Sequence, residues 1–440
     1  MAASHLSAQV VQPVPSVSVT KSEVGRAFFS SDVDLGLHGF MEEEFFLQGR
    51  ARLYDLDGSA PPRILDGSHP YKTRIIVRRP TRPEGFNGVV LVEWLNVTAG
   101  FDLDIDWVQT HEHILRSGYA WVGVSAQRVG VHGPGVGLCA WNPERYGSLD
   151  LTADSTLLSD ELAADVFAQA AAVLRNSRRA EVLGPLEPEM VLAIGHSRSA
   201  NRLSAYYNRV QPITRVVDGF IIHGGGARLD GEVGSKVMKV NAETDLWAMA
   251  QAAQRQPDSE QLRTWEVAGS SHVDQYFLDT LEELWDRDVG APLPLDCEQP
   301  PMSRIPFRYV LNAAIEHLRT WVDEGISPPS APPIQTKMSE GEVRAIRDDH
   351  GNALGGIQLP DHAVPIALNS GRNAGGGFCT LFGSHESFSP TTLRRLYPTR
   401  EAYVEAFAKA VKKSLDGGFI LQSDADIMLR EVASASVGRR

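Results

Sequence analysis

The stretch MVLAIGHSRSANRLSAYY, residues 190–207, joins a continuous apolar run to a helical segment through a short turn. Its first part is typical of a strand covered on both faces of a sheet. Its second part belongs to a helix that we expect over residues 199–210. Gly195 and Ser199 flank the turn and are small, so strand and helix can approach closely. The sequence therefore predicts a tight strand–turn–helix corner with Ser197 at its tip.

A serine at such a corner is a candidate nucleophile. The strained turn projects its side chain beyond the sheet, and the N–H groups and dipole of the following helix favour developing negative charge. The pattern is G-x-S-x-S, with Ser199 where glycine is usual. The backbone N–H of Arg198 is the first predicted oxyanion donor. An ordinary strand-to-helix turn is the alternative, and the strand and helix on either side favour the catalytic interpretation.

A serine hydroxyl needs a neighbouring base that a carboxylate orients, and on such a sheet both partners follow later strands, acid first. Glu243 and Asp245 follow one predicted strand, and His272 follows the next. We favour Asp245 as the acid because it lies two residues further into the turn, and Glu243 remains the competitor. His272 would take the Ser197 proton and return it to the leaving alcohol, which typically contributes ~10²–10⁴-fold.

The second oxyanion donor is expected in the loop after the first central strand, residues 89–97. A backbone N–H of Leu95 or Asn96 is the candidate. The alternative is that Trp94 and Leu95 only complete the strand.

The rest of the chain alternates strands with helices, which predicts an α/β fold with a mostly parallel, doubly wound sheet flanked by helices. An outer antiparallel pair is expected at residues 48–56 and 71–79. The expected central strands are residues 89–97, 119–126, 189–195, 215–225, 235–245 and 263–272. The expected helices are residues 104–118, 153–176, 199–210, 306–325 and 400–415.

Composition changes suggest three parts: an N-terminal extension (1–47), a core (48–326) and a C-terminal extension (327–440). The Pro-rich segment SPPSAPPIQT, residues 327–336, marks the second boundary. We expect the C-terminal extension to cover the active-site face as a partial lid.

The 440 residues are 42% hydrophobic and 22% charged, with a formal net charge of −13. This acidic balance argues against nucleic-acid binding. Cys139, Cys297 and Cys379 show no CxxC spacing, so we expect neither a zinc site nor a disulfide framework, and a reducing compartment. No signal peptide or membrane-spanning run is recognisable, so a cytoplasmic protein is expected.

No metal or cofactor is expected. The HEH triplet at residues 111–113 places its histidines two positions apart on a helix, where they point apart. No G-x-G-x-x-G follows the first strand, which argues against a dinucleotide-dependent oxidoreductase.

Several segments resemble a bacterial family of alpha/beta-hydrolase-domain proteins. They are NGVVLVEWLNVTAGFDLDIDW, GYAWVGVSAQRVGV, VLAIGHSRSANRL, AETDLW, WEVAGSSHVDQY and, in the tail, GGFCTLFG and LRRLYPTREAY. The resemblance implies an α/β-hydrolase fold and a serine hydrolase with Ser197, His272 and an acid at Asp245 or Glu243. It implies little about the substrate.

We therefore expect a serine hydrolase that acts on a small-molecule carboxylic ester through an acyl-enzyme. An acyltransferase or lactonase with the same triad is the alternative within the fold, and a non-catalytic ligand-binding protein is the alternative outside catalysis. Neither nucleic acid nor membrane is an expected partner, and a homo-oligomer is left open.

Overall fold

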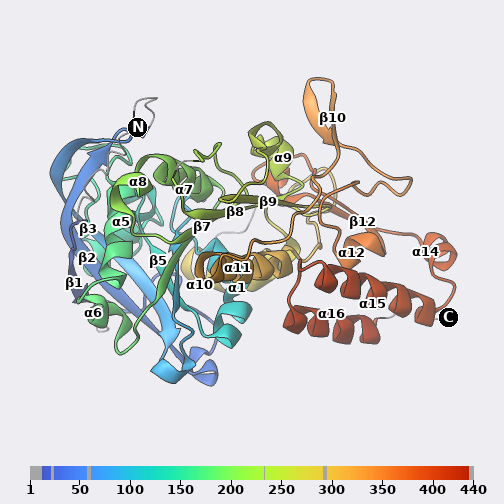
Figure 1. Cartoon of the computed structure of the whole chain (residues 1–440), viewed down its shortest axis with the longest axis horizontal. Coiled ribbons are helices and arrows are strands. Elements are labelled where there is room, and N and C mark those ends of the chain that lie inside the picture. The colour runs from blue at the N-terminus through green and yellow to red at the C-terminus, as the bar shows by residue number, and fades with distance from the viewer. Residues whose placement is uncertain (1–11, 21–23, 57–60, 232, 291–294, 436–440) are drawn as a thin grey trace, which may run out of the picture. The chain divides into compact units, whose positions relative to one another are not determined.

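The computed structural model describes residues 12–20, 24–56, 61–231, 233–290 and 295–435. The chain divides into two compact units. Unit 1 comprises residues 1–107, 111–220 and 229–235, and unit 2 comprises residues 108–110, 221–228 and 236–440. The predicted boundary at residue 327 therefore lies inside unit 2. Figure 1 shows the chain coloured from its N-terminus to its C-terminus.

The central sheet has nine strands in the order β1-β2-β3-β5-β4-β6-β7-β8-β9. In unit 1, β1, β2 and β3 form an antiparallel outer part, and β4 is parallel to β5 and β6. The long β2–β3 pair is conspicuous in Figure 1 and confirms the predicted antiparallel pair. The strands described in unit 1 are β1 (Ser16–Val19), β2 (Phe40–Tyr54), β3 (Ile64–Pro80), β4 (Val89–Trp94), β5 (Ala120–Val124) and β6 (Met190–His196).

Burial explains why the central strands are mostly apolar. Every residue of β4, β5 and β6 is buried, so no face of these strands needs polar residues. This confirms the strands predicted at residues 89–97, 119–126 and 189–195. The sheet and its flanking helices confirm the predicted fold class.

The helices that lie wholly or mostly in unit 1 include the two next to the predicted corner and oxyanion loop, α7 and α1. They are η2 (Leu35–His38), η3 (Pro83–Gly85), α1 (Ile105–Ser117), α2 (Arg128–His132), α3 (Leu138–Trp141), α4 (Pro143–Tyr146), α5 (Ala163–Leu174), α6 (Arg179–Leu183), α7 (Arg198–Arg209) and α8 (Gln211–Thr214). α1 and α7 confirm the helices expected at residues 104–118 and 199–210.

The helix predicted over residues 153–176 is ten residues shorter at its start, since α5 begins at Ala163. Ala153, Asp154 and Ser155 have φ angles of 49°, 56° and 67°, which a right-handed helix does not contain. The Asp150 carboxylate accepts the N–H groups of Thr152 and Asp154 and folds this segment into turns. Local side-chain-to-backbone bonds therefore replaced the expected first helical turns.

Unit 2 contains the end of the sheet that carries the acid and histidine loops. β8 and β9 are parallel, and Ile357 from the C-terminal extension forms a further parallel bridge to Val267 in β9. The remaining strands of the sheet are β7 (Gly219–His223), β8 (Lys236–Ala242) and β9 (Leu262–Val267). The helices before the extension are α9 (Asp245–Ala248), η4 (Gln251–Gln254), α10 (Gln275–Asp288) and α11 (Phe307–Glu324). The sequence predicted α11 but not α10.

The C-terminal extension forms two small antiparallel hairpins and several helices. The hairpins are β10 (Thr336–Ser339) with β11 (Glu342–Ala345), and β12 (Ala367–Ser370) with β13 (Ser384–Ser387). The helices are α12 (Pro360–Ala363), α13 (Cys379–Phe382), α14 (Pro390–Leu396), α15 (Arg400–Asp416) and α16 (Gln422–Ser434).

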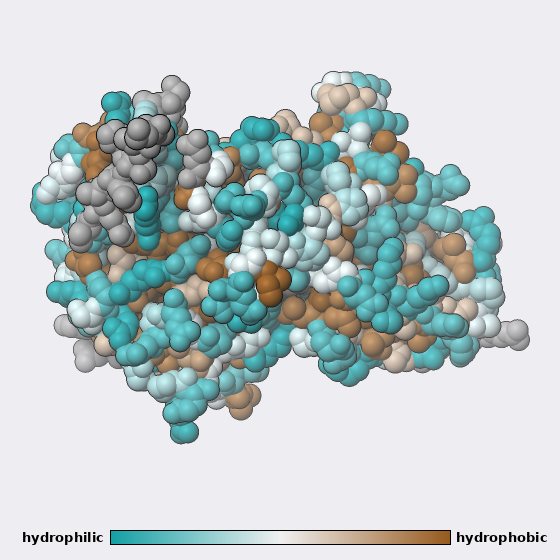
Figure 2. All heavy atoms as spheres, viewed as in Figure 1, coloured by the Kyte–Doolittle hydropathy of each residue, from teal (hydrophilic) through white to brown (hydrophobic). Residues whose placement is uncertain are grey.

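α15, the helix predicted at residues 400–415, packs beside α16. Figure 2 shows mainly hydrophilic side chains on the outer face of this helix pair. Among the helices that the structure describes, none combines the length and the apolar character needed to cross a bilayer.

The expectation of unpaired cysteines is wrong for two of the three. Cys297 and Cys379 form a disulfide across a sequence separation of 82 residues, and Cys139 is free. Their spacing gave no signal because the segments meet only in the folded chain, where Glu298 N–H donates to Ala374 O at 2.7 Å. A structural disulfide is typical of an oxidising compartment, and the predicted cytoplasmic location stays a prediction.

Candidate active site

Ser197 occupies the corner between β6 and α7 that the sequence predicts. Its backbone has φ 60° and ψ −116°, a conformation that a non-glycine residue adopts only at a cost of about 1–3 kcal/mol. Such strain is typical of a nucleophile held on a sharp strand-to-helix turn. The side chain is largely buried, since the residue is 7% exposed.

The small residues around Ser197 allow the close passage of strand and helix. A Cβ added to Gly195 would lie 3.0 Å from Leu203 Cδ1 and 3.1 Å from Ser199 Cβ, closer than side chains usually pack. Ser199 is fully buried, and its hydroxyl donates to Leu95 O at 3.1 Å. Serine therefore replaces the usual glycine here without leaving an unsatisfied polar group.

The predicted first oxyanion donor has suitable geometry. Arg198 is the first residue of α7, and the first N–H groups of an α-helix have no acceptor within the helix. The N–H next to Ser197 thus belongs to the positive end of the helix dipole.

The structure does not support Leu95 or Asn96 as the second oxyanion donor. Leu95 N–H donates to Val124 O at 3.3 Å, and Asn96 N–H donates to Leu103 O at 2.9 Å, so both groups already have acceptors. The Asn96 side chain instead donates from Nδ2 to His196 O at 2.9 Å, which ties this loop to the serine corner. The next N–H in the loop, that of Val97, has no acceptor among the residues that the structure describes and becomes the alternative donor.

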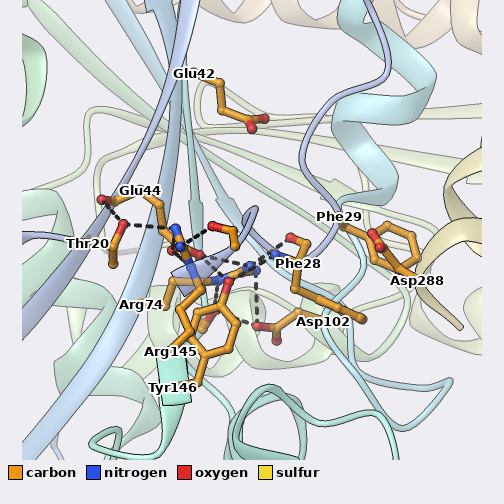
Figure 3. A network of polar contacts seen from close by, with 12 residues as sticks. Thr20, Phe28, Phe29, Glu42, Glu44, Arg74, Asp102, Arg145, Tyr146 and Asp288 are labelled. Atoms are coloured by element: carbon orange, nitrogen blue, oxygen red, sulfur yellow. Dashed lines mark hydrogen bonds and ion pairs between the residues drawn. The ribbon is translucent and has the colours of Figure 1, made fainter. Parts of the chain in front are cut away.

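A buried polar network around Asp102 fixes the end of the loop that follows β4. Asp102 accepts hydrogen bonds from Ser125 Oγ at 2.5 Å and from Arg74 Nη2 at 3.4 Å. Figure 3 shows Arg74 between Asp102 and Glu44. Burial raises the pKa of Asp102, and the Arg74 charge opposes that rise. A Cβ on Gly130 would lie 1.9 Å from Asp102 Oδ1, so packing also holds this carboxylate in place.

Unit 2 brings Asp245 and His272 together. Asp245 begins α9 just after β8, and its Oδ1 lies 2.5 Å from His272 Nδ1. Its Oδ2 accepts the N–H of Ala242 at 2.6 Å. Asp245 is 1% exposed and His272 is 6% exposed. An acid and a histidine on loops after successive strands are thus hydrogen-bonded, as the order serine–acid–histidine requires.

Glu243, the competing acid, has other partners. Its Oε2 accepts the Gly269 N–H at 2.9 Å, and its Oε1 accepts the Gly371 N–H at 3.1 Å. Arg347 Nη2 forms an ion pair with Oε1 at 2.5 Å. Glu243 therefore binds the histidine loop and the C-terminal extension rather than the imidazole. The sequence did not indicate this role, because Arg347 lies 104 positions away.

The histidine loop itself is held from several sides. Gly269 has φ 74°, and Ser303 Oγ donates to its carbonyl at 2.6 Å. Val273 N–H donates to Leu381 O at 3.1 Å. Asp274 caps α10 by accepting the Phe277 N–H at 2.9 Å. Burial raises the pKa of the Asp274 carboxyl group.

Within the described part of the chain, no group of three or more histidine, cysteine, aspartate or glutamate side chains could hold a metal ion.

Comparisons with known proteins identify a family and a fold. A family described as an alpha/beta hydrolase domain has a model that matches residues 10–430. No curated protein sequence matches the chain as a relative.

Similar solved structures include fungal esterases from Rhizomucor miehei, at 12% identity and a TM-score of 0.34, covering 67% of this chain and 93% of that one. Another is an α/β serine hydrolase without a lid from Xanthomonas campestris, at 13% identity and a TM-score of 0.30, covering 56% of this chain and 97% of that one. Likenesses this distant carry no argument about substrate or mechanism.

Proposed function

The chain belongs to the alpha/beta hydrolase domain family, and from this premise we propose that it is a serine hydrolase that cleaves a small-molecule carboxylic ester. The observation that carries the proposal is the hydrogen bond between Asp245 and His272. A carboxylate at Nδ1 keeps the proton on that nitrogen, so Nε2 is the basic one. The strained backbone of Ser197 at a helix N-terminus supports its role as the nucleophile.

In the proposed reaction, Ser197 Oγ attacks the acyl carbonyl while His272 Nε2 takes its proton. The tetrahedral oxyanion receives hydrogen bonds from the N–H groups of Arg198 and Val97. Asp245 stabilises the imidazolium, which then gives its proton to the departing alcohol and leaves an acyl group on Ser197. A water molecule, deprotonated by His272, attacks this ester, and the acid leaves as Ser197 regains its proton.

An acyltransferase or a lactonase would use the same groups and differ only in what attacks or leaves. Product analysis separates them: an ester substrate is offered with competing alcohols, and the free acid, rather than a new ester, is the expected product.

Labelling with a fluorophosphonate tests whether the protein is a serine hydrolase at all. We expect the parent protein to be labelled and the Ser197→Ala variant to remain unlabelled. Turnover of a p-nitrophenyl ester should fall by at least ~10³-fold in Ser197→Ala and in His272→Ala. Ser204→Ala is the control on the same helix, since its hydroxyl donates to Asn201 O within that helix, and it should be labelled like the parent. An unlabelled parent, or turnover within tenfold in either catalytic variant, would overturn the proposal.

A further inference from the structure

We propose that the ion pair between the buried Glu243 and the partly exposed Arg347 is a positioning pair that aligns Asp245 with His272. Through this pair, the C-terminal extension would hold two loops in position for the reaction: the acid loop, which carries Asp245, and the histidine loop, which carries His272. The inference rests on the proposed function, and neither residue is assigned a contact with substrate.

Glu243 joins the acid loop to the histidine loop at two points. Its side-chain Oε2 accepts the Gly269 N–H at 2.9 Å, and its own N–H donates to Ser270 Oγ at 3.3 Å. Ser270 Oγ in turn donates to Val267 O at 2.7 Å, at the end of β9. Glu243 lies two residues before Asp245, and Gly269 lies three before His272. These bonds therefore fix the separation of the two loops immediately beside the Asp245–His272 contact.

Arg347 holds the Glu243 side chain from the C-terminal extension. Its Nη2 lies 2.5 Å from Glu243 Oε1 and 3.0 Å from Ser370 Oγ, and its Nη1 donates to Gly351 O at 3.0 Å. The Glu243 side chain is 2% exposed and that of Arg347 is 26% exposed. A carboxylate so deeply buried requires strong donors, and the charged guanidinium is the strongest of its three.

Gly371, the residue that follows β12, contacts the acid loop beside Glu243. Gly371 N–H donates to Glu243 Oε1 at 3.1 Å, and Gly371 O accepts Thr244 Oγ1 at 2.6 Å and Trp247 Nε1 at 3.3 Å. A Cβ on Gly371 would lie 2.5 Å from Thr244 N, so the two segments are in direct backbone contact. The acid loop is thus held between the histidine loop and the extension, with Glu243 bonded to both.

Loss of Arg347 should act through geometry rather than through substrate binding. The Glu243 carboxylate would keep two backbone donors but lose its counter-charge. A buried carboxylate without a counter-charge is unfavourable, so the side chain would move towards water. The loops would then move relative to each other, and catalytic hydrogen bonds tolerate displacements of only about 0.5 Å. The expected signature is a lower kcat with an unchanged KM.

The chain offers a matched control in the Arg255–Glu266 pair. This pair has nearly the same exposure, 28% for Arg255 and 3% for Glu266, and it also joins β9 to the extension, through Ile334. Its contacts are to residues 334–336 rather than to the loop of His272. Arg255→Met should therefore reduce stability much as Arg347→Met does, without the same effect on catalysis.

The kinetic test compares these variants on a p-nitrophenyl ester. We expect Arg347→Met to lower kcat about tenfold or more with KM within twofold, and Arg347→Lys to recover part of the loss by restoring the charge. Arg255→Met should keep kcat within twofold of the parent. Equal losses of kcat in Arg347→Met and Arg255→Met at equal losses of stability would overturn the proposal, because the effect would then be a general one.

A second readout does not depend on turnover. The Nδ1 proton shared by His272 and Asp245 should give a far-downfield ¹H resonance in the parent, absent from His272→Ala. We expect this resonance to shift or broaden in Arg347→Met and to stay in place in Arg255→Met. An unchanged resonance in Arg347→Met would overturn the positioning role. If instead the parent neither hydrolyses esters nor reacts with a fluorophosphonate, the proposed function fails, and the resonance still decides whether Arg347 aligns the pair.

Discussion

Asp245 meets His272 Nδ1 through Oδ1 at 2.5 Å, while its Oδ2 accepts the Ala242 N–H at 2.6 Å. Because both oxygens are engaged, the carboxylate cannot rotate without losing a hydrogen bond in a buried environment. Glu243, two residues earlier, uses its oxygens for Gly269, Gly371 and Arg347. The two neighbouring carboxylates thus have separate tasks: one contacts the imidazole, and the other holds the loops.

The first prediction separates these tasks kinetically. Asp245→Asn should lower kcat by about 10⁴-fold, because an amide favours the wrong tautomer of the imidazole while preserving the shape of the site. Glu243→Gln should lower kcat far less, since its effect passes through Asp245. Steady-state kinetics on a p-nitrophenyl ester, with circular dichroism to confirm folding, measures both. A larger loss in Glu243→Gln than in Asp245→Asn would contradict this division.

Local sequence patterns were sufficient to predict features that depend only on residues close together in the chain. The corner at Ser197 depends on an apolar run, two small residues and a helix within eighteen positions, and each feature is readable in the chain. The preference for Asp245 over Glu243 followed from the length of the turn after β8, and the observed contact with His272 agrees with it.

Features that depend on distant segments could not be predicted in the same way. Val124, which accepts the Leu95 N–H, comes from a neighbouring strand, and Arg347 comes from the extension. Cys297 and Cys379 meet across 82 positions. No residue near any of these groups signals its partner, because the pairing exists only after the sheet and the extension have folded.

A second prediction concerns Gly269 in the histidine loop. Its φ is 74°, and a Cβ there would lie 2.6 Å from His362 Nδ1. Gly325, which ends α11, has the same φ of 74° but no atom within 4 Å of the added Cβ. Gly325→Ala should therefore cost only the left-handed conformation, about 1–2 kcal/mol, whereas Gly269→Ala adds a steric clash and should also lower kcat. Chemical denaturation and kinetics on both variants provide the comparison, and equal behaviour would show that His362 moves aside freely.

A third prediction concerns the disulfide. Closing a loop of this length stabilises a folded chain by about 4 kcal/mol in the chain-entropy description. The double variant Cys297→Ser/Cys379→Ser should unfold at a lower temperature, and a reducing agent should lower the melting temperature of the parent in the same direction. Cys139→Ser is the control, because that cysteine is free, and its melting temperature should retain the parent's response to the reductant. A parent whose melting temperature ignores a strong reductant that demonstrably frees both thiols would contradict the prediction.

The last prediction uses the buried lysine of β8. Burial, together with the smaller effect of the nearby Arg228 charge, lowers the pKa of Lys239 from the ordinary 10.5 to about 8. Lys239 is 2% exposed, and its ammonium donates to Gly226 O at 3.4 Å and Ala227 O at 3.3 Å. Below pH 8 the folded chain therefore carries a charge in an unfavourable place. Between pH 8 and 10.5 the unfolded chain binds more protons than the folded one, so this group makes the parent more stable as the pH rises.

Lys239→Met removes that pH-dependent gain. The free energy of unfolding of the parent, relative to the variant, should rise by about 2 kcal/mol between pH 7 and pH 10. Urea denaturation of both proteins at several pH values measures the difference, and the buried tyrosines, which also titrate at high pH, are common to both and cancel. Lys236→Met is the control on the same strand, since that lysine is only partly buried and donates to Glu260 O at the surface. A constant difference between parent and Lys239→Met across this range would show that Lys239 keeps an ordinary pKa in the folded chain.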